Sequence, residues 1–221
     1  MKEYDVILFD LDGTIIDSGE GVLNSVKYAL RKYGIEEENM ETLRKFMGPP
    51  LKNSFMEYYD FSEQQALQAI SYYREYYRAG GIFENQVYEG MPQLLRDLQA
   101  AGKRVLVATS KPEAFAREIL EHEGIEDCFS YIAGADMDET RVTKEQVLEY
   151  AFETNHIEDK ASVLMVGDRK YDVAGANFFG LDCVGVLFGY GSREEFEAEG
   201  ATYIVETVAD LRKLLLPTEE K

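Results

Sequence analysis

Short apolar runs alternate with helical patterns along most of the chain. Six runs are rich in valine, isoleucine, leucine and other apolar residues, at positions 5–9, 104–109, 130–133, 163–166, 183–187 and 202–205. Such nearly unbroken apolar character is typical of parallel strands that are covered on both faces. The segments between them end at helix stop signals, such as Gly102 after Leu98. The repeated strand–helix–strand order predicts an α/β fold with a doubly wound, mainly parallel, Rossmann-like sheet.

One interval interrupts this alternation. Between positions 17 and 83 we find only helical patterns, among them a stripe that includes Val22, Val26 and Leu30. Ser62 and Gln65 have the spacing of a capping box that begins a further helix over 63–78. We therefore predict a core made of residues 1–16 and 84–221. A small all-helical cap domain, residues 17–83, is inserted after the first strand.

The composition is that of a globular but strongly acidic chain. Its 221 residues include 42 aspartates and glutamates against 23 lysines and arginines, a net charge of −19, and 45% of the residues are hydrophobic. Such a surface repels nucleic-acid phosphates and anionic lipid, so we expect neither nucleic acid nor a membrane as a partner.

Other features indicate where the protein works. No segment approaches the roughly 20 apolar residues of a membrane span, and the first residues lack the apolar stretch of a signal peptide. Cys128 and Cys183 are too few for a disulfide framework. We expect a cytoplasmic protein that is a monomer or a weak dimer.

The first predicted strand ends in the motif Asp10-Leu11-Asp12-Gly13-Thr14. In an open α/β sheet, ligands bind at the carboxyl ends of the strands, near the point where the strand order reverses. Two carboxylates separated by one residue can divide the chemistry there, one as a nucleophile and the other as a proton donor or acceptor. An Asp-Gly turn without chemistry is the alternative. A calcium loop is disfavoured, because its glycine belongs at the sixth position and Gly13 stands at the fourth.

A second acidic pair, Asp168 and Asp172, follows the apolar run 163–166. The two residues are four apart and would share one face if a helix began there. Carboxylate oxygens suit Mg²⁺, which usually takes one or two carboxylates together with substrate phosphate. Packed beside Asp10 and Asp12, these carboxylates need a cation, or some of them must protonate.

Hydroxyl and ammonium groups complete the candidate site. Thr109 and Ser110 end another predicted strand, where their hydroxyls can hold phosphate oxygens. Lys144 stands at the start of a helical segment, and Lys111 follows Ser110. For each lysine taken by itself, a solvated surface residue is the alternative.

Together these motifs resemble those of the haloacid dehalogenase superfamily of hydrolases. Its four motifs are matched by Asp10 to Thr14, by Thr109, by Lys144, and by Gly167-Asp168 with Asp172. The helical interval occupies the place of the α-helical cap of the superfamily's first type. The overall pattern, including the segment 189–192, is most similar to phosphoglycolate phosphatases and to bacterial proteins assigned as 5′-nucleotidases.

The resemblance implies a Mg²⁺-dependent phosphomonoester hydrolase that acts on a small phosphorylated metabolite through an aspartyl-phosphate. Asp10 would attack phosphorus, while Asp12 would protonate the leaving group and later deprotonate water. Mg²⁺ would be held by the Asp10 carboxylate, the backbone carbonyl of Asp12, and Asp168. Asp172 would act close by or through water.

The same resemblance assigns the groups that bind substrate. Thr109 and Lys144 would hold the transferring phosphoryl group, with Ser110 beside them, and Lys144 would also neutralise Asp10. The turn 48–52 resembles the specificity loop of such caps, and Lys52 in it would meet an anionic group of the substrate. An exposed helix charge is the alternative for Lys52.

Two other functions stay open on the sequence. A sugar-phosphate mutase of the same superfamily also uses paired aspartates and a helical cap, although no histidine lies in the cap interval to serve as its base. A non-catalytic, receiver-like phosphoacceptor also gathers aspartates, a threonine and a lysine around a phosphoaspartate. Such a domain has no reason to carry the helical insertion or the Asp10–Asp12 pair.

Overall fold

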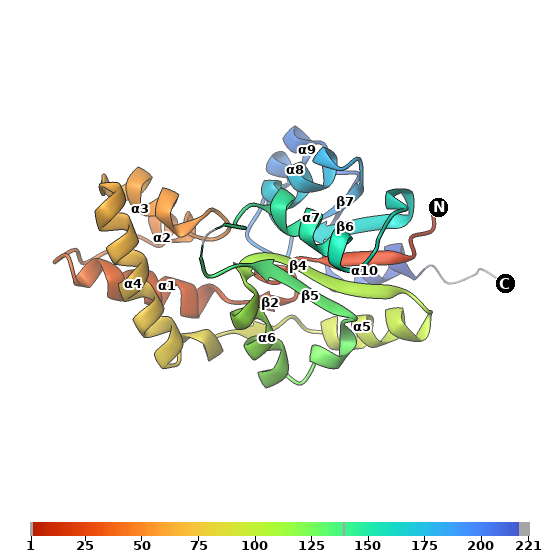
Figure 1. The fold of residues 1–221 in the computed structure, drawn as a ribbon, viewed down its shortest axis with the longest axis horizontal. Helices are drawn as coiled ribbons and strands as arrows, with labels where there is room; N and C mark the ends of the chain where they lie inside the picture. Colours follow the sequence, from red (N-terminus) through yellow and green to blue (C-terminus); the bar gives the residue numbers. More distant parts are fainter. Residues whose placement is uncertain (1, 139, 217–221) are drawn as a thin grey trace. The chain divides into compact units, whose positions relative to one another are not determined.

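The computed structural model describes residues 2–138 and 140–216 (Figure 1). The chain divides into two compact units. We call Met1–Ile16 with Val87–Lys221 the core unit, and Asp17–Gln86 the cap unit. The second boundary between the units therefore lies between Gln86 and Val87. The boundary predicted from the sequence lay between positions 83 and 84.

The core unit is built on a six-stranded sheet in the order β5-β4-β1-β6-β7-β8, and its neighbouring strands are parallel. The strands are β1 (Val6–Phe9), β4 (Arg104–Pro112), β5 (Tyr131–Ala135), β6 (Val163–Gly167), β7 (Asp182–Val186) and β8 (Tyr203–Val205). This confirms the predicted parallel, doubly wound sheet. A separate two-stranded sheet of β2 (Ile16–Asp17) and β3 (Gln86–Val87) was not predicted, because two residues show no periodicity.

Helices cover both faces of the large sheet. In Figure 1, α7 (Lys144–Thr154), α8 (Lys170–Phe178) and α9 (Arg193–Glu199) lie on one side, while α5 (Met91–Ala100) and α6 (Glu113–His122) lie on the other. Leu8 and Met165 belong to the buried cluster under α7 and α8, and the neighbouring residue Ile7 is buried as well. Strands buried on both faces explain the continuous apolar runs. The core unit also contains α10 (Val208–Leu215) and the 3₁₀ turns η2 (Glu126–Cys128) and η3 (Lys160–Ser162).

The cap unit is helical, as predicted. It contains α1 (Gly19–Arg31), α2 (Met40–Arg44), α3 (Leu51–Tyr59), α4 (Glu63–Ala79) and the 3₁₀ turn η1 (Gly81–Phe83). The predicted capping box begins α4: the Ser62 hydroxyl accepts from the backbone N–H of Gln65, and the Gln65 side chain accepts from the backbone N–H of Ser62. Among the described helices of both units, none combines the length and apolar character needed to cross a membrane.

Strand order places three loops at one edge of the sheet. β1 lies between β4 and β6, so Phe9 is paired with Val107 on one side and Val166 on the other. The chain runs from β1 outward through β4 to β5 and then crosses back to β6, so the strand order reverses beside β1. The carboxyl ends of β1, β4 and β6 therefore open next to one another, where such folds bind ligands.

The packing of Phe196 generates a stability prediction. Its ring is fully buried in α9 and takes the space left by Gly185, where an added Cβ would lie 2.6 Å from the Phe196 Cγ. Phe196→Ala should lower the free energy of unfolding by about 3–5 kcal/mol, because it leaves a cavity. Phe178→Ala, at a side chain 72% exposed, should cost less than about 1 kcal/mol. Urea denaturation measures both, and equal losses would contradict this description of the core.

Candidate active site

Asp10 is the first residue beyond β1, and its backbone continues the pairing with β6. Its N–H donates to the carbonyl of Val166 at 2.8 Å, so the residue is held where the strand ends. The chain then turns tightly: Gly13 has a positive φ of 80°, and its N–H donates to the carbonyl of Ile16 at 2.8 Å. Glycine adopts this backbone conformation without the strain that a side chain adds.

Asp168 and Asp172 reach the same place from β6 and α8. Because α8 begins at Lys170, Asp168 lies in the loop before the helix and does not share a helix face with Asp172. Backbone N–H groups hold both side chains: Tyr190 donates to Asp168 Oδ2 at 2.8 Å, and Arg169 donates to Asp172 Oδ2 at 3.0 Å. One carboxylate oxygen each from Asp10, Asp168 and Asp172 lies within 4.8 Å of the others.

Lys144 joins two of these carboxylates. It is the first residue of α7, whose N-terminus is fixed by a capping box of Thr143 and Gln146. Its Nζ lies 2.9 Å from Asp10 Oδ1 and 2.7 Å from Asp172 Oδ1, and it donates to the carbonyl of Ala108 at 2.7 Å. At 4% exposure Lys144 is not a solvated helix residue.

The three carboxylates of Asp10, Asp168 and Asp172 outnumber the one ammonium, of Lys144, that contacts them, and all four groups are largely shielded from water. Burial raises the pKa of Asp10 to about 6, since the opposing effect of Lys144 does not cancel it and Asp172 adds to it. Burial also raises the pKa of Asp168, with a further contribution from Asp172. Burial by itself disfavours the ammonium of Lys144, but Asp10 and Asp172 outweigh it, so the pKa of Lys144 is raised and the residue stays cationic.

A divalent cation fits this arrangement. Asp168 Oδ1 is buried and has no hydrogen-bond partner among residues 2–138 and 140–216. Glycines bring the backbone close around the same carboxylate: a Cβ on Gly13 would lie 2.0 Å from Asp168 Oδ2, and one on Gly189 would lie 2.3 Å from Asp168 Cβ. A buried carboxylate oxygen without a donor, among surplus negative charge, is suited to a hard cation.

The remaining predicted residues lie in three settings. Thr109 is buried at the end of the regular part of β4, and its Oγ1 accepts from the N–H of Lys111 at 3.2 Å, while Ser110 is half-buried. The carboxylate of Asp12 does not belong to the group formed by Asp10, Asp168 and Asp172. The metal contact predicted for Asp12 is made by its backbone carbonyl and does not need that carboxylate. Lys52 belongs to the cap unit, in α3, where its Nζ lies 2.5 Å from Glu63 Oε1.

Lys111 was named from the sequence only as the lysine that follows Ser110, without a role in the site. Its side chain is only 7% exposed, and its Nζ lies 2.7 Å from Asp12 Oδ1. The available signal was its position two residues after Thr109, at the end of a strand that was already assigned to the site. Pattern alone does not distinguish such a lysine from a solvated one.

Comparison with known proteins agrees with the geometry. The family of haloacid dehalogenase-like hydrolases matches residues 7–186. A 5′-nucleotidase from Pseudomonas aeruginosa is 42% identical over 96% of both chains. The tyrosine-protein kinase PtkA of Mycobacterium tuberculosis is 38% identical over 95% of this chain and 72% of its own length. A phosphoglycolate phosphatase from Colwellia psychrerythraea is 26% identical over 96% of both chains.

A solved structure extends the likeness to three dimensions. The crystal structure of a predicted phosphatase from Clostridium acetobutylicum has a TM-score of 0.94 and 48% identity, and the match covers 98% of this chain and 100% of that one. The similarity therefore spans both the core unit and the cap unit.

The charge imbalance predicts how the fold responds to Mg²⁺. At a hundred times its dissociation constant, Mg²⁺ should stabilise the wild type by about 2.7 kcal/mol, or roughly 5–10 °C in Tm for a chain of this length. Asp168→Asn should raise the Tm of the metal-free protein, because it removes a buried charge, and should abolish the response to Mg²⁺. Asp182→Asn, which alters the carboxylate paired with Lys2, should keep the response. Differential scanning calorimetry decides; an unchanged Mg²⁺ response in Asp168→Asn would exclude it as a ligand.

Proposed function

The chain belongs to the family of haloacid dehalogenase-like hydrolases and is a phosphatase, and we propose that it hydrolyses phosphate monoesters of small metabolites with Mg²⁺ and an aspartyl-phosphate on Asp10. One observation carries this proposal: the Asp10 carboxylate stands at the carboxyl end of β1, paired with buried Lys144 and grouped with the carboxylates of Asp168 and Asp172. A carboxylate can approach a phosphate dianion only where positive charge offsets the repulsion between them.

The two aspartates after β1 divide the first half of the reaction. An Asp10 oxygen bonds to phosphorus as the ester P–O bond breaks, and the electron pair of that bond goes to the leaving oxygen. Asp12 lies two residues after Asp10 and is partly exposed. It gives a proton to the leaving oxygen. This role distinguishes ester cleavage from dehalogenation, because a halide leaves without a proton.

The second half regenerates the enzyme. Asp12, now a carboxylate, takes a proton from a water whose oxygen bonds to phosphorus. The bond between phosphorus and Asp10 breaks, its electron pair returns to Asp10, and inorganic phosphate leaves.

Other groups of the core unit hold the phosphoryl oxygens. We assign this role to Lys144 and Thr109, whose side chains come from α7 and from β4, with Ser110 next to them. Asp10 and Asp168, together with the backbone carbonyl of Asp12, would hold Mg²⁺, and Asp172 would act directly or through water. When bound, Mg²⁺ supplies Lewis-acid neutralisation of the phosphate oxygens.

The substrate is assigned by similarity. We propose a 5′-nucleotide as the first candidate, since the 5′-nucleotidase relative is 42% identical, and a phosphoglycolate-type ester as the second, since that relative is 26% identical. A 5′-mononucleotide should therefore give the highest kcat/KM in a phosphate-release screen that also contains phosphoglycolate, sugar phosphates and pyrophosphate. A sugar phosphate isomerised with little net phosphate release would point instead to a mutase.

The similarity to PtkA supports a second candidate function, phosphoryl transfer to a tyrosine hydroxyl. In that reaction the acceptor replaces water and the donor is a nucleoside triphosphate. Incubation with ATP followed by detection of phosphotyrosine separates the two functions. Phosphotyrosine without hydrolysis of any monoester would favour the kinase.

Asp10→Asn tests the nucleophile. An amide oxygen is a poor nucleophile, so phosphate release should fall by at least about a thousandfold, while the far-UV circular dichroism spectrum stays unchanged. The matched control is Asp182→Asn, which alters a carboxylate bound by Lys2 and Tyr4 and should keep wild-type turnover. Substantial turnover by Asp10→Asn would sink the assignment.

A further inference from the structure

The end of β4 is bulged, and the bulge holds Lys111. Thr109 is paired with Gly134 of β5, but Ala135, the next residue of β5, is paired with Pro112. Ser110 and Lys111 are therefore extra residues on the β4 side. Bulges next to active sites bend the strand and change the direction of a side chain. Here the Thr109 hydroxyl accepts from the N–H of Lys111 at 3.2 Å and fixes the turn.

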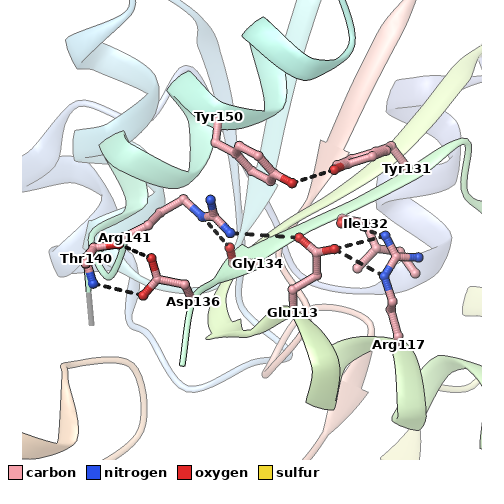
Figure 2. Close-up of polar contacts among 9 residues, drawn as sticks. All are labelled: Glu113, Arg117, Tyr131, Ile132, Gly134, Asp136, Thr140, Arg141 and Tyr150. Atoms are coloured by element: carbon pink, nitrogen blue, oxygen red, sulfur yellow. Dashed lines mark hydrogen bonds and ion pairs between the residues drawn. The ribbon is translucent and has the colours of Figure 1, made fainter. Parts of the chain in front are cut away.

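The neighbouring strand is shaped to receive this bulge. A Cβ on Gly134 would lie 2.8 Å from the Lys111 carbonyl oxygen and 2.6 Å from the Glu113 backbone nitrogen, so only glycine permits the approach. Figure 2 shows the anchor around Gly134: Arg141 Nε donates to its carbonyl at 2.8 Å, and Glu113 is paired with Arg117. Arg141 thus fixes the β5 residue that lies against the bulge, and the Glu113–Arg117 pair lies in α6, which begins directly after the bulge.

The bulge places the ammonium of Lys111 next to the carboxylate of Asp12. The Lys111 side chain is 7% exposed, the Asp12 side chain is 24% exposed, and their Nζ and Oδ1 atoms lie 2.7 Å apart. Removing a lysine from water is costly unless it is paired, and Asp12 supplies a carboxylate partner for this ammonium. The two aspartates after β1 thus each have a lysine: Lys144 for Asp10 and Lys111 for Asp12.

We propose that Lys111 is a positioning residue that holds Asp12 for the hydrolysis of the phosphoenzyme; this inference rests on the proposed function. An ammonium pairs with the carboxylate form of Asp12, which is the form present after Asp12 has given its proton to the leaving group. Lys111 fixes one oxygen of that carboxylate, so that the group is oriented to take the proton of the attacking water. Orientation of this kind contributes strongly to rate.

p-Nitrophenyl phosphate isolates this step, because its leaving group departs without a proton. With this substrate, kcat/KM reports phosphoryl transfer to Asp10, whereas kcat includes hydrolysis of the phosphoenzyme. In Lys111→Met, kcat should fall on the order of tenfold or more, KM should fall in proportion, and kcat/KM should stay within about threefold. Acid quenching with ³²P-labelled substrate should show more phosphoenzyme at steady state. The control Lys103→Met, at a lysine 3.9 Å from Asp5, should match the wild type.

A second variant pair tests whether Lys111 acts through Asp12. Once Asp12→Asn has removed the carboxylate, adding Lys111→Met should change kcat by less than about twofold, because coupled residues are not additive. If Lys111→Met does not fold, Lys111→Gln is measured in the same way.

Three results would overturn the inference alone. The first is an unchanged kcat in Lys111→Met, and the second is an equal fall in its kcat and kcat/KM with no increase in the amount of phosphoenzyme. The third is additive losses of kcat when Lys111→Met is combined with Asp12→Asn. A wild type that releases no p-nitrophenol in an Asp10-dependent manner would overturn the proposed function, and the inference with it.

Discussion

Repulsion among the carboxylates at one edge of the parallel sheet is the main constraint on the rest of the structure. Asp10, Asp168 and Asp172 place oxygens within 4.8 Å of one another, and the buried Lys144 offsets only part of their charge. Such a group is unfavourable for folding by itself, because burial penalises each charged form. In the proposed reaction a cation and an anionic ester would enter this group, and its fixed charges would stabilise phosphoryl transfer without reorganisation.

The surrounding chain is arranged to hold that cluster. Strand order brings the ends of β1, β4 and β6 together, α7 supplies Lys144 at its first residue, and glycines at positions 13 and 189 let the backbone close on Asp168. In the same way, the bulge of β4 against Gly134 places Lys111 beside Asp12. Each of the two aspartates after β1 is therefore paired with a lysine that is largely shielded from water, Asp10 with Lys144 and Asp12 with Lys111.

The sequence predicted the fold well because both faces of the sheet are covered and its strands are therefore continuous in apolar residues. It also indicated Asp10 and Asp168, since aspartates that directly follow neighbouring parallel strands lie at the same edge of the sheet. Asp172 was indicated by its spacing from Asp168, but it reaches the site from α8 and not from a helix face shared with Asp168. It did not reveal the two-residue strands β2 and β3, or the bulge that directs Lys111 to Asp12. Those features depend on backbone pairing between distant segments, and Lys111 has the same local pattern as a solvated lysine.

The proposed mechanism requires that Asp10 becomes phosphorylated during turnover. Its most direct test is borohydride reduction of the acid-quenched enzyme during turnover, followed by peptide mass mapping, because hydride converts an acyl phosphate on aspartate to homoserine. We predict homoserine at position 10 when substrate and Mg²⁺ are present, and unmodified Asp10 when either is omitted. A turning-over enzyme with no modification at Asp10, or with the modification at another aspartate, would contradict the account.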